Sequence, residues 1–264
     1  MKRRLIFIFI MILAFLLCVA AVNAEGIRGY SEQDKYCYIQ LGTYPTTAEG
    51  ERAPVLWRVL DVTDEQALLL SDKILDVQQV IFCTDREESD KRKFRKISDY
   101  SESDLNVWMN ETMLADLCSE EDFSAALVTG KYGRLYPLTD EQFLNPDYGF
   151  DKTRWITDDK CLPCRQFGGT DYAKNHVLIE GFTSKANSKL FVKKRWGSSD
   201  AWIAVVKDPD DYKLGLLGFN GHLSYGIYTR INVGVLPAMT LDLNKCTVTG
   251  GNGTKEDPFL LAVQ

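Results

Sequence analysis

Histidine is scarce in this chain of 264 residues, where only His176 and His222 occur. Two histidines are too few for a His-rich metal centre, and no nucleophile elbow or cysteine-protease signature accompanies them. Each is therefore predicted to be a structural side chain, hydrogen-bonded or exposed. The sequence predicts no metal ion, no cofactor and no catalytic residue.

The chain also has no excess of positive charge: it is acidic, with a formal net charge of -6. Loss of Lys2, Arg3 and Arg4 with the N-terminal segment would make the chain three units more negative. An acidic surface repels phosphate backbones, which argues against a nucleic-acid partner.

One long apolar run, Leu5 to Val22, follows the three N-terminal cations and closes on Val22-Asn23-Ala24. This order is typical of a secretory signal peptide spanning residues 1–24, cleaved after Ala24. A retained anchor is the alternative, because the run is close to membrane-spanning length. Cleavage predicts a secreted or cell-surface protein with no stable membrane insertion.

Six of the seven cysteines remain after cleavage, an even number that favours disulfides in an oxidising compartment. They allow fifteen connectivities, among which the sequence does not choose. The alternative is a single bridge, with the other cysteines acting as small buried apolar residues. The disulfide candidates are Cys37, Cys83, Cys118, Cys161, Cys164 and Cys246.

Strands are predicted near both ends of the chain and helices in the middle, so the fold class is α+β with both ends in one sheet. Residues 55–62 and 67–71 form a predicted hairpin around Asp64-Glu65. The expected organisation is a flexible lead at 25–35, a single domain at 36–246 and a C-terminal tail at 247–264.

Two helix starts carry capping signals. Ser101 or Ser103 precedes a helix whose apolar face is predicted to hold Leu105, Trp108, Met109, Thr112 and Met113. Thr139 and Gln142 have the spacing of a capping box, which predicts a short helix at that point.

A series of motifs in fixed order resembles a family of secreted bacterial domains known as domain-of-unknown-function family 6273. The matching segments are Gly42-Thr43-Tyr44-Pro45, Trp57-Arg58-Val59-Leu60, Leu68-Leu69-Leu70-Ser71, Leu105 with Trp108-Met109-Asn110, Leu138-Thr139-Asp140-Glu141, Thr170-Asp171-Tyr172-Ala173-Lys174 and Gly234-Val235-Leu236-Pro237-Ala238. The family is similar to C-type-lectin-like folds, which include formylglycine-generating oxidases and ligand-binding modules. The resemblance implies a twisted antiparallel sheet, two flanking helices and a face of long loops.

The chain departs from that family at three places. A Trp-Leu-Arg-Ser stretch is represented only by Arg195-Trp196-Gly197-Ser198-Ser199, while Leu236 and Asn106 stand where the family carries arginine. Any site that those arginines form in relatives is altered in this chain.

Cys161-Leu162-Pro163-Cys164 is the sharpest local motif. A redox-active dithiol needs such spacing, but the βαβ context that supports it is missing, so a structural disulfide is favoured. Zinc would need a second close cysteine pair, which the sequence lacks.

Aromatic and acidic segments supply the remaining candidates. Trp155, Trp196 and Trp202 could stack against sugar rings, and Trp196 beside Arg195 in a Gly/Ser-rich loop is the predicted ligand-binding pair. The acidic turns at 208–211 and 145–147 lack the spacing of a calcium loop and are predicted to be solvated.

The leading hypothesis is a secreted, non-catalytic, C-type-lectin-like module that binds an extracellular glycan or protein. The alternatives are a thiol-dependent enzyme on an oxidase-like scaffold, using Cys161 and Cys164, and a purely structural surface domain.

Overall fold

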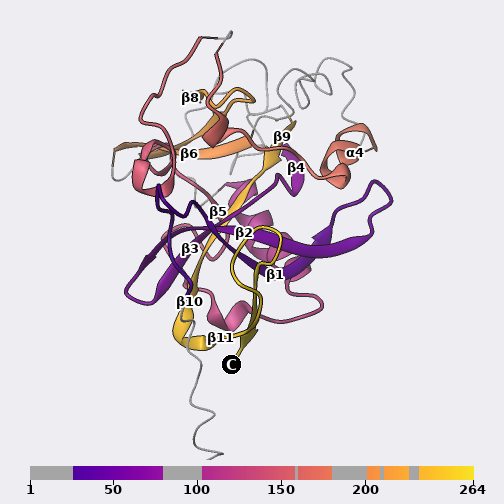
Figure 1. The fold of residues 1–264 in the computed structure, drawn as a ribbon. Helices are drawn as coiled ribbons and strands as arrows, with labels where there is room; N and C mark the ends of the chain where they lie inside the picture. Colours follow the sequence, from indigo (N-terminus) through magenta and orange to yellow (C-terminus); the bar gives the residue numbers. More distant parts are fainter. Residues whose placement is uncertain (1–25, 80–102, 158–159, 180–200, 209–210, 226–231) are drawn as a thin grey trace, which may run out of the picture.

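The computed structural model describes residues 26–79, 103–157, 160–179, 201–208, 211–225 and 232–264. These residues form two β-sheets with two longer helical segments beside them, so the chain is of the α+β class (Figure 1). The five-stranded sheet lies above the seven-stranded one in Figure 1. The predicted fold class is confirmed at this level.

The larger sheet joins the beginning and the end of the described chain. Its order is β11-β12-β1-β2-β3-β10-β5. Its strands are β1 (Cys37–Pro45), β2 (Arg52–Thr63), β3 (Gln66–Ser71), β5 (Tyr136–Pro137), β10 (Pro237–Asp242), β11 (Cys246–Gly250) and β12 (Phe259–Val263). The prediction that both ends of the chain meet in one sheet is therefore confirmed.

The smaller sheet has the order β4-β9-β6-β7-β8. Its strands are β4 (Asp76–Gln79), β6 (Ala201–Asp208), β7 (Asp211–Leu217), β8 (Leu223–Tyr225) and β9 (Asn232–Val235). Most neighbouring strands are antiparallel, but β12 runs parallel to β1 and β9 parallel to β6. Both sheets are therefore mixed and not purely antiparallel.

The β2–β3 hairpin forms as its sequence predicts. Asp64 and Glu65 both have positive φ angles, 50° and 62°, as a two-residue hairpin turn requires. Side chains of the flanking strands then face the core: Trp57 and Leu69 have no exposed surface. Burial of such large apolar groups is the main source of the sheet's stability.

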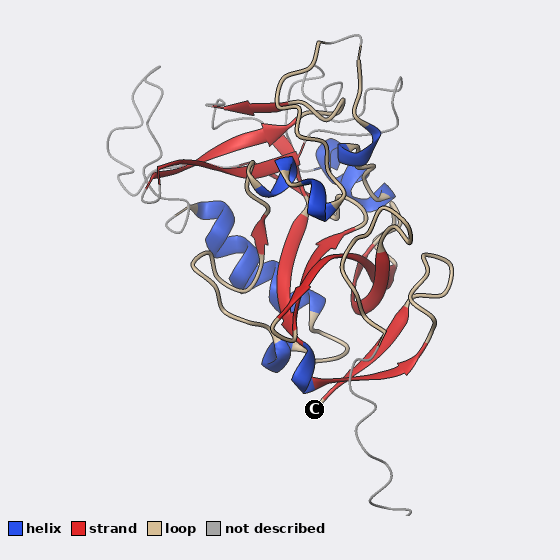
Figure 2. Cartoon of the chain, turned by 60° about the vertical axis from the view of Figure 1, so that its left-hand side comes forward, coloured by secondary structure: helices blue, strands red, loops and turns tan. Residues whose placement is uncertain are grey.

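A helical segment with a π-helical turn in its middle follows the first gap in the described residues. It consists of α2 (Asp104–Trp108), the π-helical turn η3 (Met109–Met113) and α3 (Leu114–Leu117), drawn in blue in Figure 2. Ser103 caps its start, because the Ser103 hydroxyl accepts a hydrogen bond from the Asn106 amide at 3.1 Å. This confirms one of the two predicted caps.

The π-helical turn changes which face of that segment is buried. Thr112 was predicted to face the core, but it is exposed, while Leu114 and Leu117 are buried. A π turn takes up an extra residue, which rotates the following side chains relative to a regular α-helix. The regular helical period therefore gave the wrong position for Thr112.

The second longer helix is α4 (Asp171–Ile179), which packs against β4. Five short 3-10 helices complete the helical content of the described residues: η4 (Ser124–Ala126), η5 (Gln142–Leu144), η6 (Pro146–Tyr148), η7 (Pro163–Arg165) and η8 (Leu243–Lys245). The predicted capping box precedes η5: Thr139 and Gln142 exchange hydrogen bonds of 2.9 and 3.1 Å between side chain and main chain.

The expected boundaries of the domain differ from those in the structure. Residues 26–35 are not a separate lead, because Ile27 is buried and the Tyr30 amide donates to the Leu60 carbonyl at 3.1 Å. Residues 247–264 are not a separate tail, because β12 pairs with both β1 and β11. Polar composition made residues 25–35 resemble a linker, although Tyr30 is hydrogen-bonded to Leu60 of β2.

In the part of the chain that the structure describes, no helix has both the length and the apolar character needed to cross a membrane.

Candidate functional site

Three loops meet near the five-stranded sheet: residues 151–157, 161–167 and 218–223. Main-chain groups join them, since the Leu162 amide donates to the Asn220 carbonyl at 2.9 Å and the Leu223 amide to the Arg154 carbonyl at 3.3 Å. Gly221 allows the close approach, because it has a φ of +88° and a Cβ there would lie 3.0 Å from Leu162. The three loops form one connected surface.

Trp155 is the most exposed large apolar side chain among the described residues, with 57% of its surface accessible. Its ring lies 5.0 Å from that of His222, between centroids, at an interplanar angle of 59°. The His222 Nδ1 also accepts a long hydrogen bond, 3.4 Å, from the amide of Ile156. Trp155 and His222 together are called the Trp155 platform below.

An ion pair with a buried carboxylate fixes the residue that precedes Trp155. Arg154 Nη1 lies 2.7 Å from Asp140 Oδ2, and the Asp140 side chain is only 1% exposed. Asp140 itself belongs to the capped turn that starts η5. The Trp155 loop is therefore anchored to a defined point of the fold and not held only by its own backbone.

A second arginine supports the same loop from inside the protein. Arg165 has no exposed surface, and its Nη1 and Nη2 groups donate to the carbonyls of Phe143 (3.2 Å) and Thr153. Among the residues that the structure describes, its Nε has no hydrogen-bond partner. Burial lowers the pKa of the Arg165 guanidinium, because water no longer solvates the charge.

The Cys161–Cys164 motif lies on the second of the three loops. Both cysteines are half-buried free thiols, and Cys164 lies within the 3-10 helix Pro163–Arg165. The structure therefore brings this motif close to Arg165 and to the residues that hold Trp155.

The disulfide framework predicted from the sequence is not seen in the described residues. Cys37, Cys118, Cys161, Cys164 and Cys246 are all free thiols. Cys83 lies outside the described residues.

Two of the free thiols follow the alternative of small buried apolar residues. Burial raises the pKa of the Cys37 thiol, and it raises that of Cys246 to about 11. Cys246 Sγ also donates to the Asp242 carbonyl at 3.4 Å. Burial likewise raises the pKa of Cys118, which lines a hollow of about 330 Å³ beside the α3 helix.

A separate polar centre joins the two sheets and α4. The Asp76 carboxylate is buried and accepts hydrogen bonds from the Tyr44 hydroxyl at 2.5 Å and the Val77 amide at 2.7 Å. His176 Nδ1 lies 2.6 Å from Asp76 Oδ1, and the Tyr172 ring lies 5.2 Å from the imidazole. The planes of the two rings make an angle of 44°. His176 is thus hydrogen-bonded, as predicted for a structural histidine.

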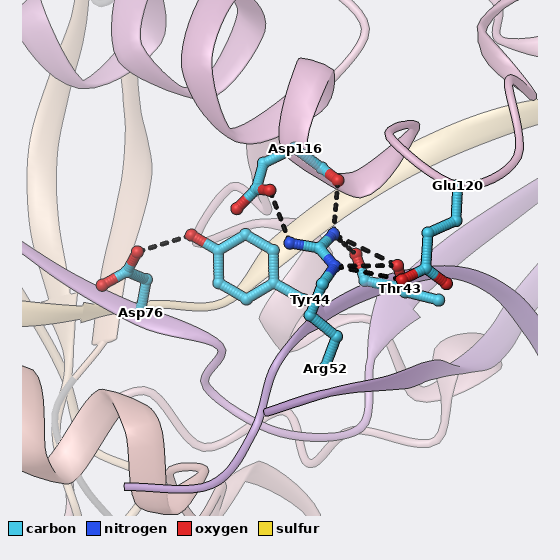
Figure 3. A network of polar contacts seen from close by, with 6 residues as sticks. All are labelled: Thr43, Tyr44, Arg52, Asp76, Asp116 and Glu120. Carbon is cyan, nitrogen blue, oxygen red and sulfur yellow. Dashed lines mark hydrogen bonds and ion pairs between the residues drawn. The ribbon is translucent and has the colours of Figure 1, made fainter. Parts of the chain in front are cut away.

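Figure 3 shows that this centre adjoins a second polar network around Arg52. Arg52 Nη1 and Nη2 donate to the side chain and the carbonyl of Asp116, both at 2.6 Å. Nη2 also donates to the Thr43 carbonyl at 2.8 Å. Burial and the neighbouring Asp76 carboxylate raise the pKa of Tyr44 far above its ordinary value, so its hydroxyl stays a donor. These contacts hold β1 against α3 and β4.

A third charged cluster links the large sheet to the loops. Arg58 Nε donates to Asp72 Oδ1 at 2.7 Å, and Lys255 Nζ lies 2.8 Å from Asp72 Oδ2. The Arg58 guanidinium also lies 4.8 Å from the centre of the Phe167 ring. Burial alone would raise the Asp72 pKa, but Arg58 and Lys255 outweigh it and hold that pKa below its usual range.

The predicted ligand pair, Arg195 and Trp196, lies outside the described residues, as does the centre of the acidic turn at 208–211. The other acidic turn is a helix cap, because Asn145 Oδ1 accepts a hydrogen bond from the Asp147 amide at 3.0 Å. Within the described ranges, no group of three or more His, Cys, Asp or Glu side chains is placed to hold a metal ion.

The sequence pointed to Trp155 only as one of three tryptophans. Its neighbour His222 lies more than sixty residues away in sequence, and Asp140 and Arg165 approach from two further segments. The signal in the sequence was a tryptophan in a loop-rich stretch, without any sign of its exposure. Its partners follow from the fold.

The chain was compared with known proteins at three levels. No family model, no curated protein and no solved structure matches it.

Proposed function

We propose that this chain is a secreted, non-catalytic binding module whose Trp155 platform takes a glycan. The N-terminal segment 1–24 places the module outside the cytoplasm in this proposal, as a signal peptide cleaved after Ala24. The ordered motifs from Gly42 to Ala238 make a C-type-lectin-like scaffold part of the same proposal.

The observation that carries the proposal is the exposure of Trp155 on an anchored loop. An indole ring supplies a large flat surface with two rotatable bonds, so little conformational freedom is lost when a ligand stacks on it. Asp140 and Arg165 anchor the two residues that precede Trp155, through the Arg154 guanidinium and the Thr153 carbonyl. Such preorganisation lowers the cost of binding.

The distribution of exposed apolar side chains favours a sugar over a broad protein interface. Among the described side chains, the large apolar ones that are exposed are Val107, Trp155 and Leu260, which belong to three separate elements. A protein partner of ordinary affinity covers a continuous patch with apolar residues at its centre. A single aromatic ring beside a polar imidazole suits one face of a sugar ring.

A glycan array with the purified mature chain tests the proposal. Trp155→Ala is expected to weaken binding to the selected glycan at least about tenfold, since one buried aromatic contact contributes more than about 1.4 kcal/mol. Val107→Ala is the matched control, because it also removes an exposed apolar side chain but on a different element. It should bind like the native chain.

Trp196→Ala extends the test to the ligand residue predicted from sequence. Loss of binding in both tryptophan variants would indicate one site that includes both residues. Loss in Trp196→Ala alone would contradict the assignment to Trp155. Absence of binding to every sugar would overturn the glycan proposal, and pull-down of one extracellular protein through Trp155 would replace it with a protein-binding one.

A further inference from the structure

The hollow of about 330 Å³ beside the helical segment 104–117 is built from three elements. They are the π-helical turn η3, the α3 helix with the turn that follows it, and the loop that precedes β5. Ligand sites in proteins commonly enclose about 300–1,000 Å³, so this hollow is at the small end of the range. It therefore fits a molecule of a few heavy atoms.

One wall of the hollow is fixed by the Asn110 side chain, which belongs to η3. Its Oδ1 accepts hydrogen bonds from the amides of Arg134 at 2.7 Å and Leu135 at 3.0 Å, and its Nδ2 donates to the Leu135 carbonyl at 2.9 Å. Gly133 permits this approach, because its φ is +93° and a Cβ there would lie 2.5 Å from Asn110. The loop that carries Arg134 is therefore clamped to the π-helical turn.

A second wall is the turn after α3. Asp122 Oδ1 accepts a hydrogen bond from the Ser124 amide at 2.9 Å, which fixes the carboxylate at the hollow. The hydrogen bonds from Ser124 lower the pKa of Asp122, and the charge of Arg134 lowers it further. Burial raises the pKa of Cys118, while Asp122 adds to this effect and Arg134 opposes it. The carboxylate and the guanidinium thus act on the same thiol.

Charges of both signs therefore line one small hollow. Glu111 and Asp122 are its anionic groups and Arg134 is its cationic group, while Leu114 and Ala115 supply apolar surface. A ligand with a single charge would be attracted by one of these groups and repelled by the other. A zwitterion with a small apolar part is complementary to both.

We propose that the hollow is a binding site for a free α-amino acid with a small apolar side chain. The carboxylate of the amino acid pairs with the Arg134 guanidinium, and its ammonium group pairs with the Asp122 carboxylate. Its side chain lies against Leu114 and Ala115. A free amino acid carries both charges on one carbon atom, as a hollow of this size requires, whereas the two ends of a peptide are farther apart. This inference does not depend on the proposed glycan site, which uses other residues.

Cys118 reports on the occupancy of the hollow, because it lines the hollow as a half-buried free thiol. The reduced mature protein is pulsed with N-ethylmaleimide at pH 7 with and without L-alanine, and peptide mass spectrometry measures each cysteine separately. L-Alanine at ten times its dissociation constant is expected to slow the labelling of Cys118 about tenfold, since about nine-tenths of the sites are then occupied. Cys161 and Cys164, half-buried thiols on another loop, should label at an unchanged rate.

Analogues that lack one charge test the two pairings on the native chain. L-Alaninamide keeps the ammonium group, and N-acetyl-L-alanine keeps the carboxylate. Each is expected to bind at least about tenfold more weakly than L-alanine in isothermal titration calorimetry, because each has lost one hydrogen-bonded charge. Equal binding of either analogue, or tighter binding of L-alanyl-L-alanine, would overturn the assignment to a free amino acid.

Arg134→Gln and Asp122→Asn remove the same charges from the protein. The asparagine side chain keeps an oxygen for the Ser124 amide, so the turn is retained. Both variants should weaken L-alanine binding about tenfold. Arg28→Gln is the matched control, because it removes an exposed arginine from another segment, and it should bind like the native chain. If a variant does not fold, the analogue series decides alone. A rate of Cys118 labelling that neither L-alanine nor L-valine changes would contradict the proposal.

Discussion

The seven-stranded sheet and the three loops that hold Trp155 are stabilised in different ways. In the sheet, Trp57, Leu69 and Met239 have no exposed surface, and each packs into a continuous apolar core. In the loops, order comes from polar contacts such as that of Arg154 with Asp140 and those of the buried Arg165 guanidinium with the carbonyls of Phe143 and Thr153. Buried apolar groups are concentrated in the first region, and the exposed Trp155 ring lies in the second. This separation lets the loops vary without loss of the fold.

The largest loss of stability is expected from a substitution in the core of the seven-stranded sheet. Trp57→Ala should lower the free energy of unfolding by about 4 kcal/mol, because it leaves a large cavity. It also removes the hydrogen bond from Trp57 Nε1 to the Leu41 carbonyl at 2.9 Å. Urea denaturation monitors the change, and Val107→Ala serves as an exposed control. A loss below about 1 kcal/mol would mean that the sheet does not dominate stability.

The centre between the two sheets should show the next largest effect. Asp76→Asn removes the charge that accepts hydrogen bonds from Tyr44 and His176 and should destabilise the protein by about 3 kcal/mol. The same denaturation assay measures it. Asp171→Asn is the matched control, since the Asp171 side chain is exposed and pairs with the exposed Lys174, and it should leave the midpoint unchanged. Equal effects of both variants would contradict the role of Asp76.

The link between sheet and loops should depend on pH. Because the Asp72 pKa is lower in the folded protein, its contribution is complete above the unfolded value of about 3.9 and disappears as the pH falls through the folded value. Asp72→Asn should therefore lower the free energy of unfolding by about 2 kcal/mol at pH 7 and leave it almost unchanged near pH 2. Denaturation curves between pH 2 and pH 7 measure it, and a cost that is constant over this range would exclude the linkage.

The smallest effect on stability is expected at the Trp155 platform itself. Trp155→Ala should change the free energy of unfolding by less than about 0.5 kcal/mol, because the ring is mostly in water. The same variant should lose glycan binding. Thermal denaturation beside the array separates the two readouts, and a large loss of stability would place Trp155 with the core residues instead.

Local signals in the sequence predicted local structure well. The turn at Asp64-Glu65, the cap at Ser103 and the capping box of Thr139 and Gln142 each depend on residues within three positions of one another. Hydrogen bonds over such short spans form almost independently of the rest of the chain. They could therefore be read from the sequence alone.

The remaining features depend on contacts that the sequence does not display. The π-helical turn that exposes Thr112 has no local signature, and Asp76 meets Tyr44 and His176 over spans of 32 and 100 residues. The exposure of Trp155 is equally a result of packing elsewhere. A site assembled from distant segments can be recognised only after the fold is known.

The parallel pairing of β12 with β1 has a consequence for the order in which the protein is completed. Ile39 pairs with Phe259, so β1 must wait for a partner that is made more than 200 residues later. Contacts of such long range slow folding, because the intervening chain must first be ordered. Until β12 arrives, β1 keeps an open edge, which is a surface for wrong pairing between chains. Nascent or shortened forms that lack residues 259–263 should therefore aggregate more readily than the finished chain.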